Sequence, residues 1–215
     1  IHRGKTGQDG GNIYLKGASP VFRNCIIESG SATSGLGGGV YCSNGSPVFE
    51  NCNFNTNHGG DGGAVFAESS TLVFENCIFR YGDAENGAGL YLRDCNATLS
   101  QCEIRGNEAS ESGGGIFADV SLVTMIDGSL NFNEAYSHGG AIYCRTGSRP
   151  FVVESYVLRA NQASYGAAVC WDGCTDATMR SCTLVENNSH VTGNAFYCWG
   201  SSTPLVTNTI VSFGL

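Results

Sequence analysis

One short unit recurs along this 215-residue chain and constrains its fold more than any other feature. Each copy has an apolar residue directly after a pair drawn from Gly, Ala and Asn, and successive copies lie 25–27 residues apart. These anchor residues are Ile13, Val40, Val65, Leu90, Ile116, Ile142, Val169 and Phe196. Eight copies fill residues 1–215 without a linker, so we predict a single solenoid domain, itself a segment of a longer protein.

Each copy contains three short runs rich in β-branched and aromatic residues. The second copy reads "GVYCS", "PVFEN" and "CNFNTN", with Gly, Asn or Ser between the runs. No run is long enough for an ordinary helix, and a period of 3.6 residues is absent. The pattern predicts an all-β, single-stranded parallel β-helix of eight coils, each of about 25–27 residues with three strands.

Stacked coils place equivalent residues about 4.7–4.9 Å apart, so like residues should form columns. The anchors form one inward column. The second run contributes Phe22, Phe49, Phe74, Leu99, Met125, Val153, Met179 and Val206, and the third contributes Ile27, Phe54, Phe79, Ile104, Leu130, Leu158, Leu184 and Val211. The alternation of inward and outward side chains is interrupted between the second and third runs, which predicts a corner of the coil there.

The corner carries a ladder of short polar residues followed by cysteines, among them Asn24, Asn51, Asn76, Cys25, Cys52, Cys77 and Cys102. Counting by twos from the Phe column places Asn51 inward, and counting back from the third run places Cys52 inward. We expect the asparagines to bond corner backbone groups and one another. Gly128, Tyr156 and Thr209 occupy the same column as the cysteines, so this column predicts buried fillers, with no metal, cofactor or catalytic thiol. A Cys170–Cys174 bridge closing a small loop remains an alternative for those two thiols.

A second set of asparagines ends the third run of several copies. Its members are Asn57, Asn107, Asn133, Asn161 and Asn187. Asparagine tolerates the left-handed conformation, and we expect these residues to adopt it.

The residue after each anchor predicts an outward aromatic ladder, interrupted by Cys170. Its members are Tyr14, Tyr41, Phe66, Tyr91, Phe117, Tyr143 and Tyr197. One interpretation is self-stacking beneath folded-back loops, which stabilises the sheet. The other is an exposed apolar strip that docks a partner strand, another protomer or a glycan.

Two residues further on, charge alternates from coil to coil through Glu68, Arg93, Asp119, Arg145 and Asp172. Opposite charges on adjacent strands favour a structural charge ladder. Asp119 and Asp172, two coils apart, would also lie roughly 9–10 Å apart, near the upper limit for an inverting glycosidase. Arg145 stands between them, so an uncluttered acid pair is missing, and we expect no enzyme site. The four histidines, at positions 2, 58, 138 and 190, are expected to be turn residues.

Three short stretches carry a resemblance to a known family. "GGAV" (62–65), "GGAI" (139–142) and "FNTN" (54–57) resemble the GGA[ILV] and FxxN motifs of polymorphic outer-membrane protein repeats. The resemblance implies a right-handed β-helix and a secreted or surface-exposed segment of adhesin type.

The net charge and the composition exclude several classes of binding partner. Net charge is −8, the pI is near 4.8 and Lys or Arg runs are absent, which argues against nucleic acid and anionic membranes. No apolar stretch approaches the ~20 residues of a membrane span, so this segment should not insert. We therefore expect an extracellular or cell-surface structural or adhesive solenoid, without a cofactor. Its partners would be a longer parent chain, further copies stacked end to end, or a glycan or surface protein. The alternative is a pectin lyase-like polysaccharide lyase or hydrolase acting on acidic glycans.

Overall fold

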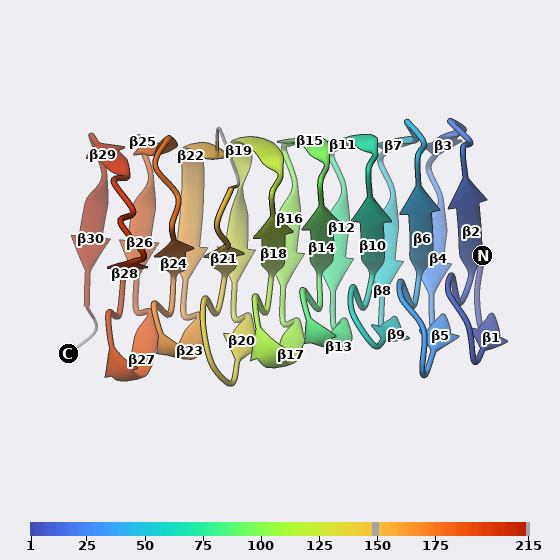
Figure 1. Cartoon of the computed structure of the whole chain (residues 1–215), viewed down its shortest axis with the longest axis horizontal. Coiled ribbons are helices and arrows are strands. Elements are labelled where there is room, and N and C mark those ends of the chain that lie inside the picture. The colour runs from blue at the N-terminus through green and yellow to red at the C-terminus, as the bar shows by residue number, and fades with distance from the viewer. Residues whose placement is uncertain (148–150, 214–215) are drawn as a thin grey trace.

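The computed structural model describes residues 1–147 and 151–213, which stack into a rod of parallel coils (Figure 1). The described residues form thirty short strands in three sheets. None of them forms a helix long and apolar enough to span a bilayer. The predicted all-β parallel solenoid is confirmed, because each strand pairs in parallel with its counterpart one coil away.

The anchor residues open the strands of the first sheet. Its order along the rod is β2 (Ile13–Lys16), β6 (Val40–Ser43), β10 (Val65–Glu68), β14 (Leu90–Arg93), β18 (Ile116–Asp119), β21 (Ile142–Cys144), β24 (Val169–Asp172) and β28 (Phe196–Trp199). Anchors are register partners throughout, so the columns read from the sequence are the columns of the sheet.

The second and third predicted strands belong to one bent sheet of fourteen strands. The second-run strands are β3 (Val21–Arg23), β7 (Val48–Glu50), β11 (Thr71–Glu75), β15 (Asn96–Ser100), β25 (Ala177–Arg180) and β29 (Leu205–Thr207). The third-run strands are β4 (Ile26–Glu28), β8 (Asn53–Asn55), β12 (Ile78–Arg80), β16 (Glu103–Arg105), β26 (Thr183–Val185) and β30 (Ile210–Ser212). In two coils the strand continues through the corner, as β19 (Leu122–Asn131) and β22 (Phe151–Arg159).

A third sheet forms where the sequence shows no apolar run. Its short strands are β1 (Lys5–Thr6), β5 (Ser31–Ala32), β9 (His58–Gly59), β13 (Asp83–Asn86), β17 (Glu108–Ser112), β20 (Glu134–Ala135), β23 (Gln162–Tyr165) and β27 (Asn188–Thr192). Small residues face inward here, and Ala84, Ala109, Ala135 and Ala163 pack into a cluster of their own with Ala88. Their small side chains explain why hydrophobic patterning did not predict these strands.

The inward columns fill the rod as predicted. Phe49, Phe54, Phe74 and Phe79 are fully buried. The Phe54 and Phe79 rings stack with centroids 4.6 Å apart, and Phe49 stacks on Phe74 at 5.2 Å. The two end coils are the exceptions: Ile13 and Phe22 of the first coil are only partly buried, and Val206 and Val211 of the last are 37% and 38% exposed.

Each turn of the coil depends on residues with positive φ. In the GGA motif the first glycine takes this role, and Gly62 has φ of 68°. A Cβ on the next residue, Gly63, would lie 2.5 Å from the Ala88 carbonyl oxygen of the following coil. The glycine pair is therefore needed both for a left-handed corner and for close stacking of the coils.

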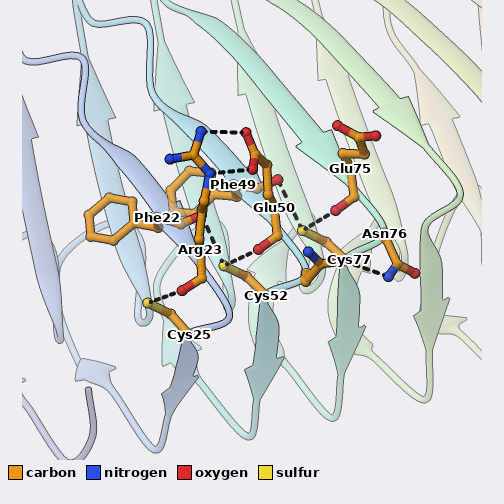
Figure 2. A network of polar contacts seen from close by, with 10 residues as sticks. Phe22, Arg23, Cys25, Phe49, Glu50, Cys52, Glu75, Asn76 and Cys77 are labelled. Carbon is orange, nitrogen blue, oxygen red and sulfur yellow. Dashed lines mark hydrogen bonds and ion pairs between the residues drawn. The ribbon is translucent and has the colours of Figure 1, made fainter.

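The Asn-Cys corner differs from the prediction in one respect (Figure 2). Asn24, Asn51 and Asn76 have φ of 55°, 53° and 50° and are exposed. A left-handed residue resets the in-and-out alternation, so the expectation that Asn51 faces inward was wrong. Asn76 Nδ2 donates to Asn51 Oδ1 at 2.7 Å, and the next residue, Cys52, is buried.

The second set of asparagines was also assigned the wrong conformation. The residue before each of them takes the left-handed conformation instead, as in Thr56, Phe132 and Glu186. The asparagines themselves are buried, from Asn57 at 1% exposure to Asn187 at 5%. Their side chains bond backbone and one another, and we call this set the buried Asn ladder.

Candidate functional site

The outer face of the first sheet carries the aromatic ladder and the alternating charges side by side. Tyr14 stacks on Tyr41 with ring centroids 5.0 Å apart, and Tyr41 stacks on Phe66 at 5.7 Å. Phe66 and Tyr91 follow at 5.1 Å, and Tyr91 and Phe117 at 4.6 Å. The rings therefore form a continuous stack along the rod, favourable for offset aromatic contacts.

The aromatic ladder is largely inaccessible. Tyr41, Phe66, Tyr91, Phe117 and Tyr143 are at most 7% exposed. Of the two interpretations of this ladder, stacked and covered rings fit these five residues, because neighbouring side chains cover both flanks of the rings. Tyr14, in the first coil, is 53% exposed, and Tyr197 is half-buried.

One covering column lies four residues before each anchor. It comprises Asp9, Leu36, Asp61, Asn86, Ser112, His138, Tyr165 and Thr192. Leu36 packs directly against the aromatic ladder. Asn86 Nδ2 donates to Asp61 Oδ1 at 3.0 Å, and the Ser112 amide donates to Asn86 Oδ1 at 3.2 Å. This column is thus tied together from coil to coil.

The other covering column is the charge ladder. The Tyr41 hydroxyl donates to Glu68 Oε1 at 2.6 Å, and the Arg93 guanidinium lies 5.4 Å from the Phe66 centroid and 5.3 Å from that of Tyr91. Burial, together with the Glu68 carboxylate, raises the pKa of Tyr41 to about 12. These cation–π and hydrogen-bond contacts explain why the charges lie over the rings.

In the column four residues before the anchors, His138 and Tyr165 are aromatic, and their rings meet Tyr197 and Trp199 of β28. The His138 ring stacks with Tyr165 at 5.1 Å and with Trp199 at 6.0 Å, and Tyr165 meets Tyr197 at 5.2 Å. We call these four residues the aromatic cluster. Trp199 is 46% exposed, and the other three are partly exposed. The cluster and Tyr14, at opposite ends of this face, are where rings are both stacked and open to solvent.

Asp172 is the acidic group beside the aromatic cluster. It accepts a hydrogen bond of 3.1 Å from the Tyr143 hydroxyl through Oδ2, and it follows directly after Trp171 on β24. Burial lowers the pKa of His138, and the negative charges of Asp172 and Glu111 oppose that shift. His138 Nδ1 lies 2.7 Å from Ser137 Oγ, so this imidazole is held in place on one edge.

The three residues of the alternative catalytic site lie in one column but are engaged in fixed contacts. Arg145 Nε lies 3.1 Å from Asp119 Oδ1, and Asp119 is 7% exposed. Asp172 is held by Tyr143. Within residues 1–147 and 151–213, no group of three or more His, Cys, Asp or Glu side chains is placed to hold a metal ion.

The corner cysteines are free thiols bonded to carbonyl oxygens (Figure 2). Cys77 Sγ donates to the carbonyls of Phe49 and Glu75, each at 3.4 Å, and Cys52 repeats this with Glu50. Burial raises the pKa of Cys52 to about 11. Cys170 and Cys174 are also free and buried, so no bridge closes the loop between them. The geometry is that of a structural filler.

Sequence reasoning missed His138, Tyr165 and Trp199 as members of one cluster. His138 was expected to be a simple turn residue, and Trp199, which the structure pairs in register with Asp172, was given no role. The missed signal is positional, since His138 and Tyr165 lie four residues before successive anchors. Because residues at the same distance from successive anchors stack in one column, this shared offset predicts that His138 and Tyr165 are neighbours.

Comparison with known proteins gives the family. The profile described as "right handed beta helix region" matches residues 5–129 and 38–212, which together span nearly the whole chain. No curated protein and no solved structure matched.

Proposed function

Because the chain belongs to the right-handed β-helix family, whose fold fits a structural or a glycan-acting role, we propose that it is an adhesive structural solenoid. It would act outside the cell or at the cell surface, as a rigid rod that binds a glycan through the aromatic cluster and Asp172. A surface protein, a longer parent chain and further copies of the rod are the other partners that this proposal allows.

The observation that carries the proposal is the aromatic cluster beside Asp172, in which the partly exposed His138 ring stacks with Tyr165 and with Trp199. A pyranose ring has an apolar face that stacks on an aromatic ring and hydroxyls at its edge that bond carboxylates. Trp199 is 46% exposed, and its plane lies 7° from that of His138, so the ring is presented at a fixed angle. Tyr and Trp suit such surfaces because they combine a large apolar area with a polar atom.

The rigid backbone beneath the aromatic cluster favours binding of a glycan. Tyr197 and Trp199 are on β28, which pairs with β24 through four register pairs. The rings therefore lose little conformational freedom when a ligand stacks on them, and this lowers the entropic cost of binding.

The test is a binding measurement with neutral and acidic soluble polysaccharides in affinity electrophoresis. Trp199→Ala should weaken binding about tenfold, the equivalent of about 1.4 kcal/mol for one stacked ring. Tyr136→Ala is the matched control, because Tyr136 is 76% exposed and lies outside the aromatic cluster. Binding that is absent for every polysaccharide, or equal in both variants, would contradict the proposal.

The alternative is a polysaccharide lyase or hydrolase that uses Asp119, Arg145 and Asp172. Their position in one outward column favours it, since glycan cleavage needs two carboxylates on one face. The adhesive proposal predicts no new reducing or unsaturated ends when the protein is incubated with acidic polysaccharide. If the native chain depolymerises acidic polysaccharide and Asp119→Asn does not, the protein is an enzyme and the adhesive proposal is wrong.

A further inference from the structure

The outer face of the bent sheet carries two arginines that oppose each other on adjacent strands. Arg80 ends β12 and Arg105 ends β16, and the two are register partners. Like charges directly opposite each other on a sheet repel and destabilise the pairing. Among the register pairs of the described strands, this one alone places two cations together.

Both guanidinium groups lie near the same tyrosine ring. The Cζ atoms of Arg80 and Arg105 are 6.0 Å and 5.9 Å from the Tyr81 centroid. Tyr81 is 53% exposed, and the next corner residue is Gly106, where a Cβ would come within 3.0 Å of the ring. The two cations and the ring thus form one compact, solvent-facing group.

The carboxylates on this face leave one of the two cations unpaired. Arg105 Nε lies 3.0 Å from Glu103 Oε1, an ion-pair distance without hydrogen-bond geometry, whereas no carboxylate of the described residues pairs with Arg80. The Nε atoms of both arginines are buried and lack a hydrogen-bond partner among the described residues. Elsewhere on the bent sheet arginine is matched with glutamate, as in the pair Arg180 and Glu154 at 3.2 Å. An uncompensated positive charge therefore remains here on a chain with a net charge of −8.

We propose that Arg80, Tyr81 and Arg105 form a binding site for an oxyanion, a sulfate or carboxylate group. An oxyanion between the two guanidiniums would remove their repulsion and accept their N–H donors in charge-assisted hydrogen bonds. The site lies on a different sheet from the aromatic cluster and does not depend on the proposed glycan binding there.

The oxyanion can be free or borne by a polymer, and a second feature separates these sources. Two corners beyond Tyr81, the Arg159 guanidinium lies 6.0 Å from the Phe132 centroid, and Phe132 is 60% exposed. Two coils correspond to roughly 9–10 Å. A linear polyanion could contact both aromatic–guanidinium pairs, whereas a free ion contacts only the Arg80–Arg105 pair.

The first experiment is thermal unfolding in sodium sulfate and in sodium chloride at equal ionic strength. Sulfate stabilises folded proteins generally, so the comparison is between variants in the same salt. Arg80→Gln should lose the extra rise in Tm that sulfate gives the native chain, while its Tm in chloride stays unchanged or rises because the repulsion is gone. Arg180→Gln is the control, because it removes a paired arginine of the same sheet and should retain the sulfate response.

The second experiment measures binding of fluorescent dextran sulfate, with neutral dextran as the blank. Arg80→Gln should bind about tenfold more weakly, the equivalent of about 1.4 kcal/mol. A loss in Phe132→Ala as well identifies a polymer-borne anion, whereas a sulfate response without that loss identifies a free one. Equal sulfate responses and equal dextran sulfate affinities in the native chain and Arg80→Gln would overturn the site.

Discussion

Replacing Asn133 with alanine should destabilise the rod more than most single substitutions, because its buried side chain bonds both the preceding and the following coil. Asn133 is fully buried. Its Oδ1 accepts from Asn107 Nδ2 at 2.9 Å and from the Asn107 amide at 3.2 Å. Its Nδ2 donates to the Ile104 carbonyl at 3.0 Å and to Asn161 Oδ1 at 3.1 Å.

The magnitude follows from the donors left behind. Asn133→Ala leaves the Asn107 amide and one hydrogen of Asn107 Nδ2 without an acceptor in a dry interior. Each unsatisfied buried donor costs about 1–3 kcal/mol, so we expect a loss of about 2–6 kcal/mol in the free energy of unfolding. Most surface substitutions stay within about 0.5 kcal/mol.

The assay is urea unfolding followed by circular dichroism and by tryptophan fluorescence, which reports on the buried Trp171. Both probes are needed because a solenoid can unfold in parts. Asn55→Ala is the matched control, since Asn55 lies on β8 with a partly exposed side chain. A loss below about 1 kcal/mol, or one equal to that of Asn55→Ala, would refute the reasoning that the buried Asn ladder stabilises the coil stack.

Two further predictions concern titration and reactivity. The folded chain holds the Tyr41 pKa at about 12, above the unfolded value near 10, so its contribution to stability is complete below pH 10 and disappears as pH rises towards 12. Alkaline unfolding with phenolate absorbance should show this, and an unchanged stability profile in Tyr41→Phe would contradict it. Thiol labelling at pH 8 should modify the exposed Cys198 before Cys52, which should react only after unfolding because it is buried and its pKa is raised to about 11. Peptide mass spectrometry reads this out, and equal labelling rates would count against a buried corner thiol.

The fold could be predicted because a repeated strand must place equivalent residues on the same face. The Val40 and Phe49 columns were read from spacing alone, and coil stacking converts that spacing directly into contacts. The alternation of inward and outward side chains held within each predicted run and failed at the corner, where the left-handed Asn51 reverses the side-chain direction. The same limitation hid the buried Asn ladder, because the preceding residue, such as Thr56, makes the turn.

The candidate site was only partly predictable. Aromatic residues after the anchors were placed correctly on the outer face of the first sheet. Their exposure depends on segments between strands, whose path hydrophobic periodicity does not encode. Leu36 and His138 contact the rings from such segments. Tyr91 is therefore only 3% exposed, whereas Tyr14 and Trp199, in the first and last coils, are 53% and 46% exposed.

Because the sign of the charge over the first sheet alternates from coil to coil, the charge that each residue meets depends on whether an even or an odd number of coils is removed. Removing one coil, residues 90–115, would bring Glu68 beside Asp119, whereas removing two, residues 90–141, would bring it beside Arg145. The backbone would accept either deletion, since each coil contacts only its neighbours. A deletion or duplication of two coils keeps opposite charges adjacent on the first sheet, whereas a change of one coil places like charges side by side. The rod should therefore tolerate insertions and deletions of two coils better than those of one coil.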